Sequence, residues 1–315
     1  MPKPFKTGLT VGKFAPFHNG HQFLIESSLK EVDKLFVIVY DAPKHTHIPL
    51  TVRANWIRMQ YPEVTVIEGW HVPTDIGWTD EIQQKHVDFI IELLDGQEID
   101  VFFSSEAYGF RMSHALNAEN RIVDIDRKEI HVTGTDIRNN PFANRNFVPP
   151  AVYNDFITKV AFLGYNRKMT YNLVKKLSDI YQTELVTPYD DDFMVADIGL
   201  GLHKVATEIK SKTSDANQFL FIQAGLYELN LNYRQRYHVD HPEFLNIQAD
   251  HMLQPDVVFI VMSEDTIENR KLIGEFQMRN LPYIALVGNM ENQLIKVDNI
   301  LKLYKKFTNP LTIEL

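Results

Sequence analysis

Two histidines near the N-terminus, His18 and His21, lie three residues apart in the segment GKFAPFHNGH. An apolar run that ends at Gly12 precedes them, and Asn19-Gly20 is a plausible start for a helix. Two imidazoles one helical turn apart point toward the same spot, and a helix N-terminus offers N–H groups and the positive end of its dipole. The spacing therefore predicts a site for an anionic group such as phosphate at the turn between the first strand and the first helix.

Short apolar runs alternate with helical patterns along the first half of the chain. We expect strands at 9–12, 35–40, 64–69, 101–105 and 121–125, and helices at 21–32, 52–61 and 79–94, the last two capped by Thr51 and Thr79. This alternation predicts a parallel sheet with right-handed crossovers. Open sheets of this kind bind ligands at the carboxyl ends of their strands, which is where the histidine pair falls.

A polar segment broken by prolines, at 139–150, separates this half from a second one. A new strand is expected from Lys159, and further apolar runs follow at 217–225, 255–262 and 281–288. We therefore expect two α/β domains, residues 1–157 and residues 158–315.

The composition excludes several classes of function. The chain has 315 residues, 44% of them hydrophobic, and a formal net charge of -9, which argues against a nucleic-acid or membrane-surface partner because both are polyanions. With no cysteine it has neither disulfides nor thiolate metal sites. The first residues lack the apolar stretch of a signal peptide, and no apolar run is long enough to span a membrane. We expect a cytoplasmic protein.

The first segment fits the pattern G-x-F-x-P-x-H-x-G-H, with its fixed positions filled by Gly12, Phe14, Pro16, His18, Gly20 and His21. It resembles the nucleotidyltransferase superfamily, whose signature is HxGH at the end of the first strand. The superfamily carries a second element, of the type IS-x-T/A-x-x-R, at a later helix N-terminus, and HVTGTDIR at 131–138 is similar to it. Thr133 keeps the hydroxyl of the usual serine. Alone, this segment would be an ordinary capped helix start, but the pairing with HxGH implies a second phosphate cradle.

The resemblance narrows to the NadR-type nicotinamide-nucleotide adenylyltransferases of bacteria. It rests on GKFAPFHNGH, Gly77-Trp78, FSSE at 103–106, VDIDR at 123–127, VTGTDIR and the NPF that follows. The family implies a Rossmann-like N-terminal domain that transfers the adenylyl group of ATP to nicotinamide mononucleotide, giving NAD and pyrophosphate. Its GW tryptophan stacks on the nicotinamide ring, which assigns Trp78 to the substrate, although a tryptophan is more often part of a core.

The chemistry that this implies is direct in-line transfer. A phosphate monoester is already an anionic nucleophile, so catalysis reduces to positioning and to stabilising the charge that develops. We expect His18 and His21 to donate hydrogen bonds to ATP phosphate oxygens. Lys13 and Arg138 would neutralise the β- and γ-phosphates, and Thr133 with nearby N–H groups would hold them. The other residues expected at the phosphates are Gly12, Phe14, Gly20 and Gly134.

Metal ions are expected only with the nucleotide. Mg²⁺ would be carried mainly by ATP and water. His45 and His47 have the spacing of a metal pair, but no third ligand is evident, and we interpret them as part of a polar loop. Arg53 and Trp56 resemble a family segment that packs beside the site, and we give them no direct role.

The second half resembles the P-loop kinase domain that NadR proteins use to phosphorylate ribosylnicotinamide. Such a domain needs G-x-x-x-x-G-K-[ST]. After Gly164, however, Met169 stands at the second glycine, Thr170 at the lysine and Tyr171 at the Ser/Thr, while Lys168 falls two positions early. The P-loop is degenerate.

The strand FLFIQAG departs from the family in the same direction. An acidic F-I-D-T-D segment is replaced there by Gln223 and Gly225. We expect residues 158–315 to keep a kinase-like fold without kinase activity.

Other functions stay open at this point. A sister enzyme could act on phosphopantetheine or another small phosphate, the chain could keep the kinase activity as well, or it could be a non-enzymatic NAD sensor. We expect a homo-oligomer.

Overall fold

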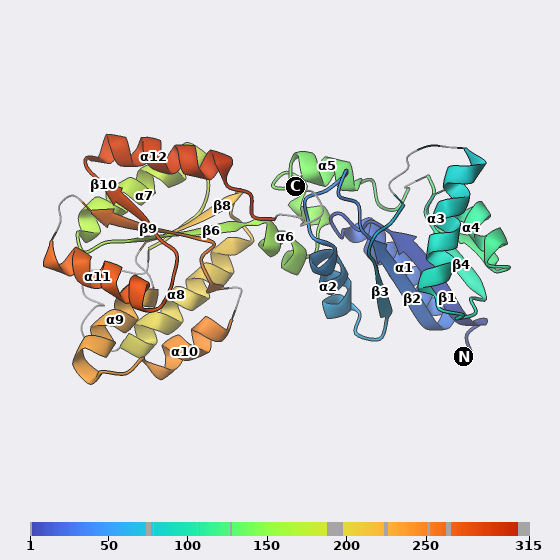
Figure 1. Cartoon of the computed structure of the whole chain (residues 1–315), viewed down its shortest axis with the longest axis horizontal. Helices are drawn as coiled ribbons and strands as arrows, with labels where there is room; N and C mark the ends of the chain where they lie inside the picture. The colour runs from blue at the N-terminus through green and yellow to red at the C-terminus, as the bar shows by residue number, and fades with distance from the viewer. Residues whose placement is uncertain are drawn as a thin grey trace. The chain divides into compact units, whose positions relative to one another are not determined.

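The computed structural model describes residues 2–73, 77, 79–106, 108–126, 128–187, 198–223, 226–250, 253–262 and 266–307. The chain divides into two compact units, of which the first holds the described residues up to Val152 together with Phe307, and the second runs from Tyr153 to Lys306. The first boundary lies inside the helix α6 (Pro150–Phe156). Each unit is built on its own sheet flanked by helices (Figure 1). None of the helices in the described ranges is long and apolar enough to cross a membrane.

The first unit contains a five-stranded parallel sheet in the order β3-β2-β1-β4-β5. Its strands are β1 (Phe5–Gly12), β2 (Val32–Tyr40), β3 (Thr65–Gly69), β4 (Val101–Ser104) and β5 (Glu119–Ile122). Its helices are α1 (Asn19–Glu31), α2 (Leu50–Gln60), α3 (Asp80–Leu93), α4 (Gly109–Ala115) and α5 (Gly134–Asn139), with a 3₁₀ turn at Arg145–Phe147.

The second unit repeats this architecture in the order β10-β9-β6-β8-β7, and all of these strand pairs are parallel. Its strands are β6 (Thr158–Leu163), β7 (Leu185–Val186), β8 (Phe219–Gln223), β9 (Val257–Met262) and β10 (Ile284–Val287). Its helices are α7 (Arg167–Tyr181), α8 (Ile198–Thr213), α9 (Leu226–Tyr237), α10 (Pro242–Ala249), α11 (Ile267–Met278) and α12 (Met290–Leu303). The expected two-domain α/β fold is confirmed.

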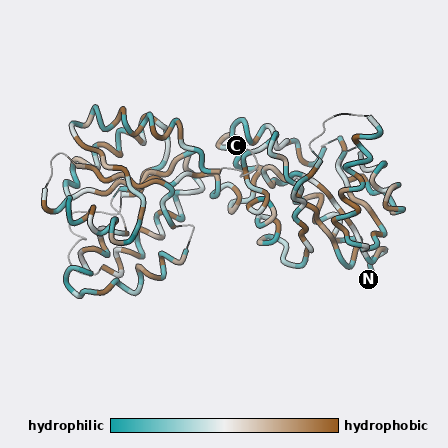
Figure 2. The backbone as a smooth tube through the Cα atoms, in the orientation of Figure 1, coloured by the Kyte–Doolittle hydropathy of each residue, from teal (hydrophilic) through white to brown (hydrophobic). Residues whose placement is uncertain are grey.

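The central strands are buried on both faces, as their continuous apolar runs predict. On β2 every residue from Leu35 to Val39 is buried, and the same holds for all six residues of β6. The hydrophobic residues follow the strands at the centre of each unit (Figure 2). The helices that pack on both faces hold each sheet in place, so ligand binding is left to the loops at the ends of the strands.

The two expected helix caps have different outcomes. Thr79 caps α3 as predicted, since its hydroxyl accepts a hydrogen bond from the N–H of Ile82. The prediction for Thr51 was wrong, because α2 begins at Leu50 and Pro49 occupies the cap position. The carbonyl of Pro49 accepts the first helical hydrogen bond from the N–H of Arg53 at 3.2 Å.

Candidate active site

The turn between β1 and α1 is tightly folded around an aromatic side chain. Phe14 is 1% exposed and has a left-handed backbone (φ 48°). A Cβ atom at Gly12 would lie 3.1 Å from the Phe14 ring, closer than most real contacts. Glycine at the end of β1 therefore lets this ring fold under the turn.

The two histidines of the signature cap the helix that follows. His18 is the N-cap residue of α1, and its Nδ1 accepts a hydrogen bond from the N–H of Gly20 at 3.1 Å. In return, Nδ1 of His21 accepts from the N–H of His18 at 3.3 Å. This is a capping box built from two imidazoles. The N–H of Gly20 comes so near the ring that a Cβ at this position would lie 2.9 Å from Cε1 of His18.

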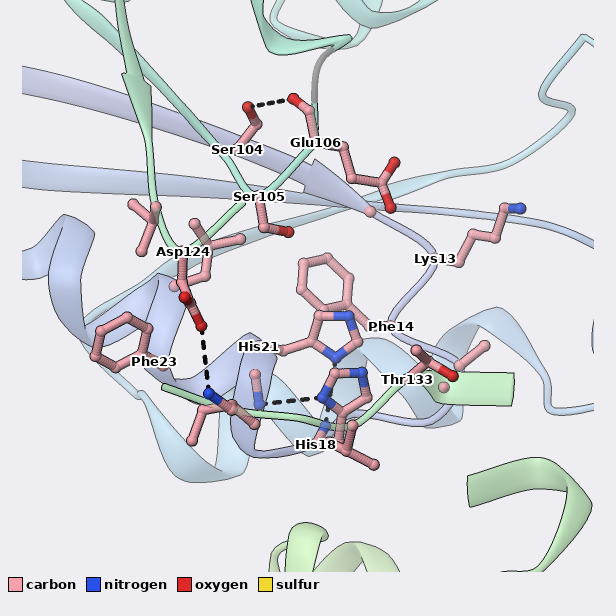
Figure 3. Close-up of a pocket in the computed structure, with 18 of the residues that line it drawn as sticks. Lys13, Phe14, His18, His21, Phe23, Ser104, Ser105, Glu106, Asp124 and Thr133 are labelled. Carbon is pink, nitrogen blue, oxygen red and sulfur yellow. Dashed lines mark hydrogen bonds between the residues drawn. The ribbon is translucent and has the colours of Figure 1, made fainter. Parts of the chain in front are cut away.

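The same hydrogen bonds determine the tautomer of both rings. Because each Nδ1 accepts a backbone hydrogen bond, the neutral form of each ring carries its proton on Nε2 and offers an Nε2–H donor. The rings of His18 and His21 stack with centroids 3.8 Å apart and planes 27° apart. Figure 3 shows them side by side, with Ser105 and Glu106 across the cavity from them. The pair is therefore held as two stacked rings whose neutral forms carry the proton on Nε2.

The second predicted motif starts α5 with another capping box. The Thr133 hydroxyl donates to Oδ2 of Asp136 at 2.6 Å and accepts from the Asp136 N–H at 3.1 Å. The N–H of Thr133 also donates to this carboxylate. Thr133 lines the cavity, but its hydroxyl proton serves the cap, so a bond from this hydroxyl to a phosphate would require the cap to open.

Arg138 joins the two motifs. Its guanidinium donates to the carbonyl of Ala15, in the first turn, and to Oγ1 of Thr135 at 2.9 Å. A Cβ atom at Gly134 would lie 3.0 Å from the same Ala15 oxygen and 3.2 Å from Nη1 of Arg138. The start of α5 thus packs directly on the first turn, which only glycine at this position allows without a shift.

A cavity of about 310 Å³ opens between these elements. It is lined by all of the predicted site residues that the structure describes: Gly12, Lys13, Phe14, His18, Gly20, His21, Thr133, Gly134 and Arg138. The last predicted site residue, Trp78, lies outside the described residues.

Side chains from three further strand ends complete the cavity, and sequence reasoning gave them no role. They are Tyr40, the last residue of β2; Ser104, the last residue of β4, with Ser105, Glu106 and Tyr108 after it; and Asp124 after β5. Asp124 orders its own loop by accepting hydrogen bonds from the N–H groups of Lys128, Glu129 and Ile130. The segments FSSE and VDIDR were the available signals, but a segment resemblance does not tell which side chain faces the ligand.

The positive charges of Lys13 and Arg138 and the carboxylate of Glu106 line the same cavity. Burial is the main cause that lowers the pKa of Lys13; the Glu106 carboxylate opposes this shift and Arg138 adds to it. Burial, with help from Glu106, raises the pKa of Tyr40 to about 12, so this phenol stays protonated near neutral pH. A bound polyanion would favour the charged form of Lys13 again.

A third histidine belongs to the surroundings of this site. The pKa of His45 is lowered, first by burial and then by the positive charges of Lys13, Arg138 and Lys44. The loop that follows β2 therefore lies within the field of the two site cations. Within the described part of the chain, no three His, Cys, Asp or Glu side chains are grouped so that they could hold a metal ion.

In the second unit, the degenerate P-loop segment is a short turn followed by a capped helix. Asn166 is the N-cap residue of α7, and its Oδ1 accepts from the N–H of Met169 at 3.0 Å. Thr170, at the position of the P-loop lysine, is 1% exposed and donates its hydroxyl to the Asn166 carbonyl at 3.1 Å. Nε2 of Gln223 donates to the carbonyl of Arg167 at 3.2 Å. Gly225 lies outside the described residues.

Comparison with known proteins supports the resemblance deduced from the motifs. The chain is 24% identical over 259 residues to the trifunctional NAD biosynthesis/regulator protein NadR of Salmonella typhimurium, covering 77% of this chain and 61% of the relative. For NadR of Escherichia coli the identity is 25% over 276 residues, with 79% and 63% covered. The chain thus spans less than two thirds of the length of these relatives. A phosphopantetheine adenylyltransferase of Fusobacterium nucleatum is 30% identical over 150 residues, 45% of this chain and 86% of that protein.

Solved structures agree on the fold. The crystal structure of a NadR protein in complex with NAD and AMP-PNP matches with a TM-score of 0.53 at 16% identity, covering 96% of this chain and 99% of that one. The NadR protein in complex with NR gives 0.52 at the same identity, with 95% and 96% covered. The two-domain α/β fold and the similarity to NadR are therefore confirmed.

The family model described as cytidylyltransferase-like matches residues 9–140, the stretch that contains both motifs and the strands between them. Through its first unit, the chain belongs to the cytidylyltransferase-like family of nucleotidyltransferases.

Proposed function

We propose that the chain transfers the adenylyl group of ATP to nicotinamide mononucleotide, producing NAD and pyrophosphate. The observation that carries the proposal is the stacked pair His18 and His21, whose Nε2–H donors belong to the same cavity as Lys13 and Arg138. The similarity to NadR proteins over 77–79% of the chain supports the nicotinamide substrate.

The reaction needs placement rather than a protein base. A phosphate oxygen of the mononucleotide attacks the α-phosphorus, a P–O bond forms, and the bond to the β-phosphate oxygen breaks with its electron pair leaving on pyrophosphate. The two histidine donors would stabilise charge on the α-phosphate as it reacts. Lys13 and Arg138 would take up the charge of the leaving pyrophosphate, together with Mg²⁺ that the nucleotide brings.

The close packing of the turns around the cavity would help to place the two reacting phosphates. Gly12, Phe14 and Gly20 shape the first turn, and Gly134 lets α5 approach it. Trp78 is the proposed face for the nicotinamide ring. We infer that this chain positions the mononucleotide phosphate beside the α-phosphate of ATP.

The direct test is to supply the purified chain with Mg-ATP and one acceptor at a time. The acceptors are nicotinamide mononucleotide, phosphopantetheine and ribosylnicotinamide, and the products are separated by chromatography. NAD from the mononucleotide supports the proposal. The relative from Fusobacterium makes phosphopantetheine the specific alternative, and a product from that arm alone would replace the nicotinamide substrate.

We also propose that the second domain, residues 158–315, has no kinase activity. In a P-loop the amides before the helix surround phosphate, whereas here the Asn166 carboxamide and the Gln223 amide occupy the start of α7 with internal hydrogen bonds. NAD formed from ribosylnicotinamide would refute this part. Light scattering on the purified chain would check the expected homo-oligomer.

A further inference from the structure

Arg53, on α2, is a fully buried arginine beside the candidate active site. Arginine is seldom fully buried unless its charge is paired, and here Nη2 forms an ion pair with Oδ1 of Asp41 at 3.1 Å. Both side chains are essentially inaccessible to solvent, at 0% and 1% exposure. Such a pair is weak evidence for stability alone, because its desolvation offsets much of its attraction.

The guanidinium also donates to three carbonyl groups from three different segments. Nη1 donates to the carbonyl of Tyr40, at the end of β2, at 3.0 Å and to the carbonyl of Lys13 in the first turn. Nε donates to the carbonyl of Ile48, before α2, at 3.0 Å. A planar fork with five N–H donors can make these contacts together, whereas the single ammonium of lysine cannot reach all of them.

Two of the three segments belong to the cavity wall. Lys13 and Tyr40 both line the cavity. The third carbonyl, that of Ile48, lies near the end of the loop from Asp41 to Pro49. In this loop, the charges of Lys13 and Arg138 contribute to lowering the pKa of His45. Arg53 therefore fixes the position of the Lys13 turn relative to the loop after β2, on the side of the site that carries the positive charge.

We propose that Arg53 is a positioning residue for the nucleotide phosphates: through the carbonyls of Lys13, Tyr40 and Ile48 it holds the Lys13 turn and the loop after β2 in the geometry that binds the triphosphate. Arg53 itself does not line the cavity among the described residues. The inference rests on the proposed function in taking ATP as the anionic ligand, and its control titration takes nicotinamide mononucleotide as the second ligand.

The test compares Arg53→Lys with Arg58→Lys on the same helix. Arg58 also forms an ion pair, with Glu68 at 2.7 Å, and donates to a carbonyl, but it is 39% exposed and takes no part in the cavity. Calorimetric titration with Mg-ATP gives the dissociation constant of each variant. A second titration with nicotinamide mononucleotide reports on general loss of structure.

We expect Arg53→Lys to weaken ATP binding tenfold to a hundredfold, as the loss of about one hydrogen bond between the Lys13 turn and a charged phosphate would produce, with mononucleotide binding unchanged. Arg58→Lys should stay within about twofold of wild type. ATP binding within twofold of wild type in Arg53→Lys would overturn the inference, as would equal losses for both ligands.

A second variant covers the case in which Arg53→Lys does not fold. Asp41→Asn keeps an oxygen that accepts from Arg53 but removes the charge that orients it, and ATP binding should weaken at least threefold; unchanged affinity would overturn the inference. Because ATP binding is measured without turnover, a chain that binds ATP and makes no NAD would refute the proposed function and still decide the role of Arg53.

Discussion

The dual role of His18 gives a prediction that separates folding from catalysis. Its Nδ1 caps α1 through the N–H of Gly20, while its Nε2–H is proposed to contact the α-phosphate. His18→Ala removes both interactions. His18→Asn removes only the second, because asparagine is among the best N-cap residues.

The magnitudes follow from the two interactions. Loss of an N-cap side chain costs about 1 kcal/mol of stability, which corresponds to a fall of about 2–4 °C in the melting temperature of a domain of this size. Loss of one donor to the reacting centre lowers kcat by about 10²–10³. We expect His18→Ala to show both losses, and His18→Asn to regain most of the stability with the same low kcat.

The assay is NAD formation under saturating substrates, with thermal unfolding followed on the same samples. Thr266→Ala is the matched control, because Thr266 caps α11 through the N–H of Asn269 at 3.2 Å and lies far along the chain from the site. It should lose stability without losing kcat. If His18→Asn regained activity together with stability, the imidazole would serve only as a helix cap and the reasoning would be refuted.

Three further predictions follow from single residues. Gly134→Ala should raise the KM for ATP about tenfold in steady-state kinetics, because the new Cβ would lie 3.0 Å from the Ala15 oxygen. The control is Gly274→Ala, where a Cβ meets nothing within 4 Å; this variant should leave the KM unchanged and stabilise α11 by up to about 1 kcal/mol. Burial lowers the pKa of Lys13, so kcat/KM for ATP should fall with rising pH below the ordinary lysine value of 10.5, and Lys13→Arg should move this fall upward in a pH–rate profile. Burial also lowers the pKa of Lys159 to about 8, so the unfolded chain binds this proton more tightly than the folded chain does, and the stability of the wild type should rise between about pH 8 and 10.5. In denaturant titrations at pH 7, Lys159→Met should be more stable than the wild type by up to about 3 kcal/mol. A less stable variant would contradict this prediction.

Much of the first motif could be predicted because its constraints are local. Gly12 ends an apolar strand, Pro16 excludes a helix, and the following Asn-Gly starts one, so the histidine pair had to fall at the strand-to-helix turn. The sheet type followed from the alternation of strands and helices. Strand order did not, since periodicity carries no information on which strands are neighbours.

The rest of the cavity depends on that order. Because β1 lies between β2 and β4, the residues at the carboxyl ends of these strands converge on the turn, and Tyr40 and Glu106 line the cavity. The role of Arg53 was missed for a related reason. Its sequence neighbourhood, VRANW, resembles a family segment that packs beside the site, but only the tertiary structure shows that the Arg53 guanidinium donates to carbonyls of three separate segments.

The start of α7 shows how a side chain can supply the acceptor that a bound phosphate supplies at the helix N-terminus of a P-loop. Helix N-termini leave N–H groups that need acceptors, and a P-loop supplies them from a bound phosphate. In this chain Asn166 supplies an acceptor from its own side chain, and α7 starts at Arg167, so that Met169 and Thr170 already lie within the helix. Returning lysine to position 170 alone would therefore bury a charge that the helix geometry cannot direct at a phosphate. The sequence predicts a second domain without the residues of a P-loop, and the Asn166 cap at the start of α7 is the physical reason why we expect Thr170→Lys alone not to produce kinase activity.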